Sequence, residues 1–250
     1  MLAPSPAVRV VKAPASSDDA ARIHVSNQMN DVETLLAEAR PLFTGLSGPC
    51  TDPAWSVRRA ELMRKLIEML PVKRAISIVL VLCREQIEQI PATGPAQWML
   101  NIITRIEEAN RTGQTIDEPN QDEWEQLNVF KPGRLRDAVR EIWRVASESG
   151  SSKQRIRDLG DAVFAIVDQD IASSWEKVAP GEPLRERELT EAIFGAPPPH
   201  DAAAIKELGR LVTARHGSPA WWETLNRAWA KVFDLIAQAL EATASKNRVR

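Results

Sequence analysis

Residues 75–83 read Ala-Ile-Ser-Ile-Val-Leu-Val-Leu-Cys, the most apolar stretch of this 250-residue chain. Taken alone, an apolar run of this length fits a buried strand as well as a buried helix. It continues without glycine or proline into residues 84–90, whose side chains favour helix, and Pro71 and Pro91 mark the two ends. We therefore predict one core helix over residues 72–90. Its expected fully buried residues are Ile78, Val81 and Leu82.

Helical periodicity recurs along most of the chain, and strand signals are nearly absent. We predict an all-α fold, an irregular multi-helix bundle of about eight helices. A short HEAT-like α-solenoid is the alternative, because several helices open at prolines roughly one repeat of about 40 residues apart. The expected organisation is a disordered arm over residues 1–17, one helical domain over 18–245 and a basic tail over 246–250. The acidic interval 110–125 is the possible subdomain boundary.

Charge balance and cysteine content indicate which compartment and which kinds of partner to expect. Lys plus Arg number 32 and Asp plus Glu number 34, so no charge excess indicates nucleic acid or a membrane surface. The core segment is shorter than the roughly 20 apolar residues that a bilayer requires, so we expect no membrane span. Cys50 and Cys83 form neither a C-x-x-C pair nor a disulfide framework. We expect a reducing, cytoplasmic compartment, with non-classical export through the N-terminal arm as the alternative.

Compact motifs for catalysis or metal binding are missing from the sequence. None of the three histidines follows a glutamate by three positions, and the H-E-x-x-H, phosphate-loop and dinucleotide-binding patterns do not occur. Acidic pairs such as Glu85 and Glu88 lie on polar helix faces rather than in a predicted cleft. We therefore predict no catalytic residue, no metal ligand and no cofactor.

Four arginines are the candidates for binding nucleic acid. Arg136, Arg140 and Arg144 follow one another at four-residue spacing on one predicted helix face, with Arg134 nearby. Converging guanidinium groups can bind phosphate with two parallel hydrogen bonds each. Acidic neighbours within the same helix favour a solvated helix face instead.

Trp221 is the candidate for binding a protein partner. At the start of the last predicted helix, Trp222 lines up with the apolar row, whereas Trp221 leads a row that turns polar. We expect Trp222 to pack in the core and Trp221 to lie at its margin, partly exposed. Tryptophan is over-represented among interface hot spots, which makes an exposed one a possible anchor.

These patterns favour a protein that binds another macromolecule and has no catalytic activity of its own. Another protein is the expected partner, and the expected role is that of an adaptor, regulator, immunity-type inhibitor or assembly subunit. A nucleic-acid-binding or coating protein that uses the arginine stripe and the basic tails is the alternative. An enzyme with a dispersed active site is the third hypothesis.

Overall fold

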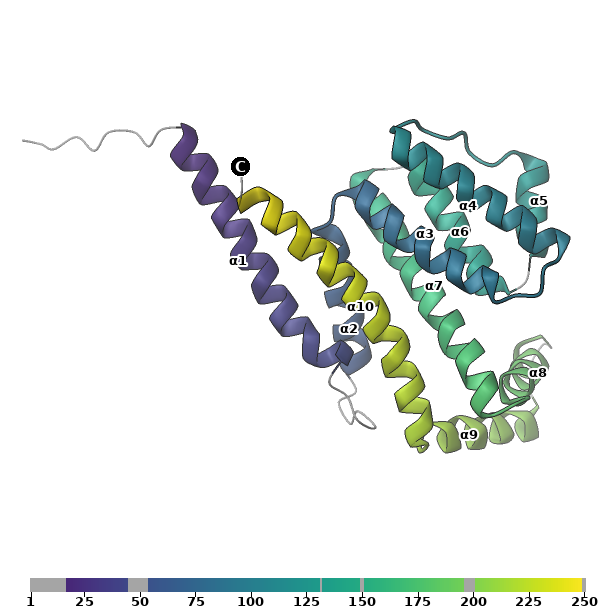
Figure 1. Ribbon diagram of the computed structural model, residues 1–250. Coiled ribbons are helices and arrows are strands. Elements are labelled where there is room, and N and C mark those ends of the chain that lie inside the picture. Colours follow the sequence, from purple (N-terminus) through teal and green to yellow (C-terminus); the bar gives the residue numbers. More distant parts are fainter. Residues whose placement is uncertain (1–16, 45–53, 131, 149–150, 196–200, 249–250) are drawn as a thin grey trace, which may run out of the picture.

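The computed structural model describes residues 17–44, 54–130, 132–148, 151–195 and 201–248, with side chains from residue 31 to residue 246. These ranges contain ten α-helices and no strand, which confirms the all-α prediction, with ten helices in place of about eight (Figure 1). In chain order the helices are α1 (Ser17–Thr44), α2 (Trp55–Glu68), α3 (Val72–Glu88), α4 (Gly94–Thr112), α5 (Gln121–Val129), α6 (Gly133–Ala146), α7 (Ser152–Val178), α8 (Glu182–Phe194), α9 (Ala202–His216) and α10 (Pro219–Arg248).

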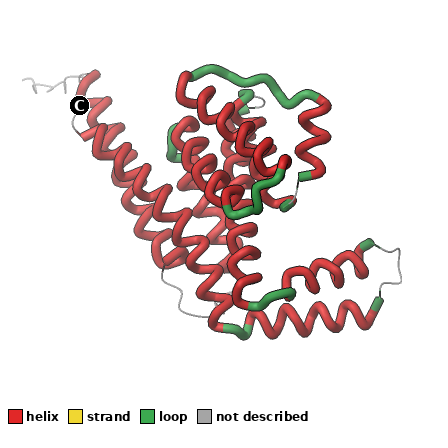
Figure 2. Tube along the Cα trace, turned by 45° about the vertical axis from the view of Figure 1, so that its right-hand side comes forward, coloured by secondary structure: helices red, strands yellow, loops and turns green. Residues whose placement is uncertain are grey.

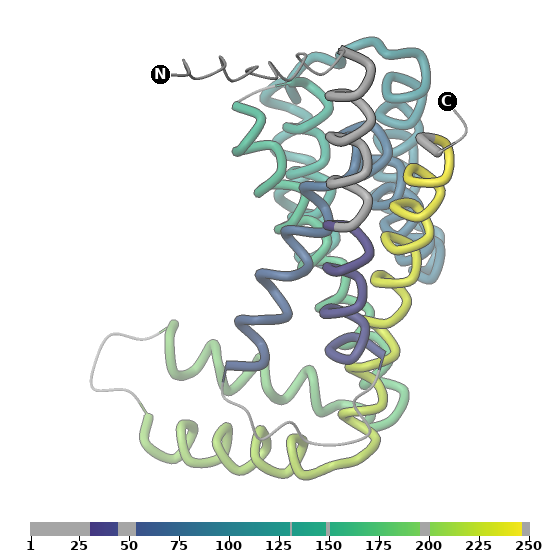
Figure 3. The backbone as a smooth tube through the Cα atoms, turned by 90° about the vertical axis from the view of Figure 1, so that its left-hand side faces the viewer, coloured from purple at the N-terminus to yellow at the C-terminus, as the bar shows by residue number. Residues whose placement is uncertain are grey.

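Helix α7 lies at the centre of the bundle, where it contacts α2, α3, α6, α8 and α10 (Figure 1). On one side of it, α1 and α10 run antiparallel and α2 packs against both (Figure 3). On the other side, α3, α4 and α6 pack together, and the short α5 lies against α6. Helices far apart in sequence thus share one core, whereas the repeats of a solenoid contact only their neighbours. The irregular bundle, and not the solenoid, describes this fold.

The segment that was predicted to form one core helix over residues 72–90 is α3, which ends at Glu88. Ile78 and Leu82 are buried as predicted, but Val81 is 46% exposed, so the prediction for Val81 is wrong. The reason is that α3 keeps one row of residues turned to solvent, at the three- and four-residue spacing of a single helix face. Val81 lies in that row together with Arg74 and Glu88, which are also exposed.

One hydrophobic core runs through the bundle without a division at the acidic interval 110–125. Buried residues from Leu36 in α1 to Leu240 in α10, on both sides of that interval, belong to one cluster. A second, small cluster lies between α8 and α9 and consists of Leu189, Ile193 and Ala204. The described residues therefore separate into a main bundle and a helical hairpin with packing of its own.

Arg59 joins the ends of three helices inside the bundle. It lies in α2, is 2% exposed, and donates hydrogen bonds through Nε and Nη2 to the Leu42 carbonyl of α1, at 3.1 and 2.7 Å. Nη2 also lies 3.3 Å from Oδ1 of Asn226 in α10. The guanidinium carbon is 3.7 Å from the centre of the Trp55 ring and 5.2 Å from that of Trp229. A carbonyl at a helix C-terminus and aromatic faces thus stabilise this buried cation.

The structure differs from the expected domain boundary at the C-terminal end of the chain. The predicted arm of residues 1–17 lies outside the described residues except for Ser17, which begins α1. Helix α10 continues to Arg248, so most of the predicted tail over residues 246–250 is helical. Within the described part of the chain, no helix is both long and apolar enough to cross a membrane.

We expect Val81→Asp to leave the protein folded and to change the free energy of unfolding by less than about 1 kcal/mol, because an exposed carboxylate stays hydrated. Leu82→Asp, one residue further along the helix, should abolish folding, because it places an unpaired charge in the core. Circular dichroism and urea unfolding of both variants check this. An unfolded Val81→Asp protein would contradict the position of α3 in the bundle.

Candidate functional site

The described side chains include no group of three or more His, Cys, Asp or Glu residues that are placed to hold a metal ion. Cys83 is fully buried in α3, and burial raises the pKa of its thiol far above the ordinary value. A thiol that stays protonated is a poor nucleophile, so Cys83 serves packing. Cys50 lies outside the described residues.

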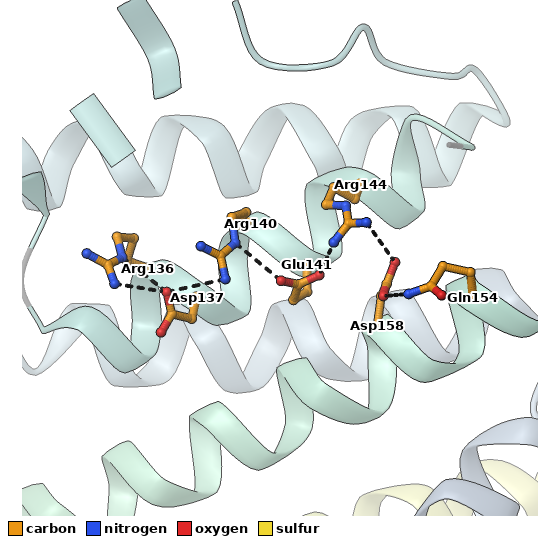
Figure 4. A network of polar contacts seen from close by, with 7 residues as sticks. All are labelled: Arg136, Asp137, Arg140, Glu141, Arg144, Gln154 and Asp158. Carbon is orange, nitrogen blue, oxygen red and sulfur yellow. Dashed lines mark hydrogen bonds and ion pairs between the residues drawn. The ribbon is translucent and has the colours of Figure 1, made fainter. Parts of the chain in front are cut away.

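The predicted arginine stripe of α6 alternates with acidic side chains along the surface between α6 and α7 (Figure 4). Nη2 atoms of Arg136 and Arg140 lie 3.0 and 3.6 Å from Oδ1 of Asp137. Glu141 is shared in the same way: its Oε1 lies 3.2 Å from Nε of Arg140, and its Oε2 lies 2.9 Å from Nη1 of Arg144. Each arginine of the stripe thus has a carboxylate of this chain beside it.

Asp158 of α7 ends this series of ion pairs. It is 2% exposed, its Oδ1 accepts a hydrogen bond from Nε2 of Gln154 at 2.5 Å, and its Oδ2 lies 4.0 Å from Nη2 of Arg144. Three arginines and three carboxylates make up this series, so its charges balance. We call the series the ion-pair row: Arg136, Arg140, Arg144, Asp137, Glu141 and Asp158.

The ion-pair row makes the hypothesis that these arginines bind nucleic acid less favourable. A phosphate group would have to compete with carboxylates that already lie beside the guanidinium groups, which reduces the gain from binding it. Arg134, the fourth candidate, lies 3.8 Å from Asp168 of α7. Nucleic-acid binding by these arginines stays a prediction, and the structure brings them together with their own counter-charges. Sequence spacing revealed the acidic neighbours within α6, but Asp158 comes from another helix.

Asp158→Ala should lower the free energy of unfolding by about 1–3 kcal/mol, because the side-chain amide of Gln154 loses the buried carboxylate that accepts its hydrogen bond. Asp161→Ala is the matched control in the same helix, since Asp161 is half exposed and forms only a surface ion pair with Arg64. The control should cost less than about 1 kcal/mol. Urea unfolding of the two variants measures the difference, and equal losses would contradict the structural role of Asp158.

Trp221 and Trp222 are both partly buried at the start of α10. Trp221 lies at the margin of the core as expected, whereas Trp222 does not belong to the core cluster, so the prediction for Trp222 is wrong. Trp221 packs against the main core, with its ring centre 5.3 Å from that of Trp175 and its indole N–H enclosed without a hydrogen-bond partner. Trp222 lies 5.9 Å from Trp55 and donates a hydrogen bond to the carbonyl of His216 at 2.7 Å. Both rings find neighbours because α2, α7 and α9 all contact α10. A role for Trp221 as a partner-binding anchor stays a prediction.

A group of charged and aromatic side chains joins the α8–α9 hairpin to the bundle. Arg215 of α9 is 8% exposed, lies 3.4 Å from Glu182 and 2.7 Å from Glu186 of α8, and sits over the Trp221 ring at 4.8 Å. Trp175 of α7 donates a hydrogen bond to Glu182 at 2.9 Å. We call this group the Arg215 joint: Arg215, Glu182, Glu186, Trp175 and Trp221. It fixes the direction in which the hairpin leaves the bundle.

The α8–α9 hairpin projects from the base of the bundle (Figure 2). Its contacts with the rest of the protein run from α8 to α7 and from α9 to α10. Seven large apolar side chains are exposed among the described residues, and three of them lie on the hairpin. These three are Leu184 at 49%, Phe194 at 72% and Ile205 at 49% exposure. The sequence gives no sign that these two helices stand apart, because helical periodicity does not show which helices pack together.

Comparison of the chain with protein-family models, with curated proteins and with solved structures finds no significant match. The candidate surfaces rest on the residues and geometry of this chain.

Proposed function

We propose that this protein binds another protein, and that the α8–α9 hairpin is the contact surface. The expected role is that of an adaptor, regulator, immunity-type inhibitor or assembly subunit without catalytic activity of its own. The observation that carries the proposal is the exposure of apolar side chains on a projecting arm. Apolar area that leaves water on binding contributes about 25 cal/mol per Å², so Phe194 and its neighbours favour association.

The surface of α8 has the mixture of side chains found at protein interfaces. Leu184 and Phe194 lie toward the two ends of the helix, and the exposed charged residues Arg187, Glu188 and Glu191 lie between them. Protein interfaces contain both apolar and charged side chains, and the exposed surface of α8 offers both. The Arg215 joint supports the same proposal, because an arm that is held in one direction loses less conformational entropy on binding.

We expect a variant with Leu184→Ser, Phe194→Ser and Ile205→Ser to lose most of its partner binding while it keeps its fold. The test is capture by the tagged full chain from a nuclease-treated lysate of the source organism, followed by quantitative mass spectrometry. A protein that the wild type retains should fall at least tenfold with the hairpin variant.

The matched control carries Val57→Ser and Val129→Ser, which remove exposed apolar side chains from α2 and α5. It should retain the captured protein at the wild-type level. Equal capture by the hairpin variant and the control would refute the hairpin as the contact surface. Capture that disappears on nuclease treatment would favour a nucleic-acid partner over a protein.

A further inference from the structure

A groove of about 450 Å³ runs between α3 and α4, at the place where Val81 is exposed. Its apolar lining comes from Pro71, Leu80 and Val81. The position of Val81 is notable because the sequence around it is that of a core helix, yet nearly half of its side chain contacts solvent. The groove therefore offers apolar surface that the fold itself does not cover.

Positive charge in this groove lacks the compensation seen in the ion-pair row. Lys73, Arg74, Arg111 and a single carboxylate, that of Glu107, line it. Arg111 is paired, since it lies 2.5 Å from Glu108 on the same helix. Glu107 is also engaged outside this set, by Arg84 at 2.5 Å.

Lys73 and Arg74 supply the uncompensated charge. Both are exposed in the first turn of α3, and neither forms an ion pair with any described carboxylate. The ammonium of Lys73 points toward the end of α4, because a Cβ placed on Gly113 would lie 2.8 Å from its Nζ. Two cations at the edge of an apolar groove favour a ligand that brings its own negative charge.

Asn110 of α4 adds a hydrogen-bond acceptor to the same groove. Its Nδ2 donates hydrogen bonds to the carbonyl of Lys73 and to the hydroxyl of Ser77, both at 2.9 Å. These contacts fix the orientation of the amide, and the Oδ1 atom has no partner among the described residues. An acceptor of this kind can take a hydrogen bond from the backbone N–H of a bound peptide.

We infer that the α3–α4 groove binds a short segment of another protein in which an apolar side chain stands next to carboxylates. The apolar side chain contacts Pro71 and Val81, the carboxylates pair with Lys73 and Arg74, and a backbone N–H donates to Asn110. The groove volume lies within the roughly 300–1,000 Å³ of ligand sites, which suits one or a few side chains. The inference rests on the proposed protein-binding function but uses a surface distinct from the hairpin.

A selection from phage-displayed random peptides on the immobilised full chain tests this inference. Enriched peptides should combine an apolar residue with neighbouring Asp or Glu. One selected peptide, labelled with fluorescein, is then titrated with wild type and variants by fluorescence anisotropy. Lys73→Glu combined with Arg74→Glu, and separately Val81→Asp, should each weaken its affinity at least tenfold. Both variants should fold, because acidic residues suit the first turn of a helix and Val81 is exposed.

Matched controls carry the same changes on other faces of the bundle. Lys153→Glu combined with Arg157→Glu reverses two exposed charges of α7, and Val129→Asp alters an exposed valine of α5. Neither should change peptide affinity by more than about twofold, which is a small free energy. The hairpin variant should also bind the peptide with wild-type affinity. The groove inference and the hairpin proposal can therefore be refuted independently of each other.

Three results would overturn the inference. Enriched peptides without acidic residues would remove the role of Lys73 and Arg74. Unchanged affinity in either groove variant would place the peptide elsewhere on the protein. Displacement of the peptide by a DNA oligonucleotide whose own binding is insensitive to Val81→Asp would make the groove a phosphate site instead.

Discussion

Helix α7 is enclosed by five other helices, and the rest of the structure depends on burying it from several sides at once. This requires apolar residues around most of its circumference, which its buried residues from Leu159 to Trp175 provide. It also requires close approach, and Gly160 allows this where a Cβ would lie 3.2 Å from Cγ of Arg64 in α2. The buried carboxylate of α7, Asp158, is stabilised by Gln154 and by the charge of Arg144.

The surfaces around this core differ in how their charged side chains are paired. Along the ion-pair row every cation lies beside a carboxylate of the same chain. Arg215 uses two glutamates to hold the hairpin, and Arg59 uses a carbonyl and aromatic rings to hold three helices. At the α3–α4 groove, by contrast, Lys73 and Arg74 lie near the exposed side chain of Val81 without an ion pair to a described carboxylate.

The sequence allowed prediction of the features that depend on local pattern. The all-α class, the core helix α3 and the arginine spacing on α6 all follow from periodicity within single segments of the sequence. Exposure of Val81, the partner Asp158 and the separate hairpin could not be predicted in this way, because each depends on which helix covers which face. The position of Trp222 was predicted wrongly for the same reason: the contacts of α10 with α2, α7 and α9 decide which residues are covered, and the sequence of α10 alone does not show these contacts.

The central claim is that one closed bundle carries an arm with separate packing. Native-state hydrogen exchange, read by mass spectrometry at several low urea concentrations, measures this most directly. The account predicts that amides of α8 and α9 exchange together through an opening of lower free energy than those of α3, α6 and α7. Exchange of the hairpin and α7 with the same free energy and the same urea dependence would contradict it, because the hairpin would then unfold as part of the bundle core.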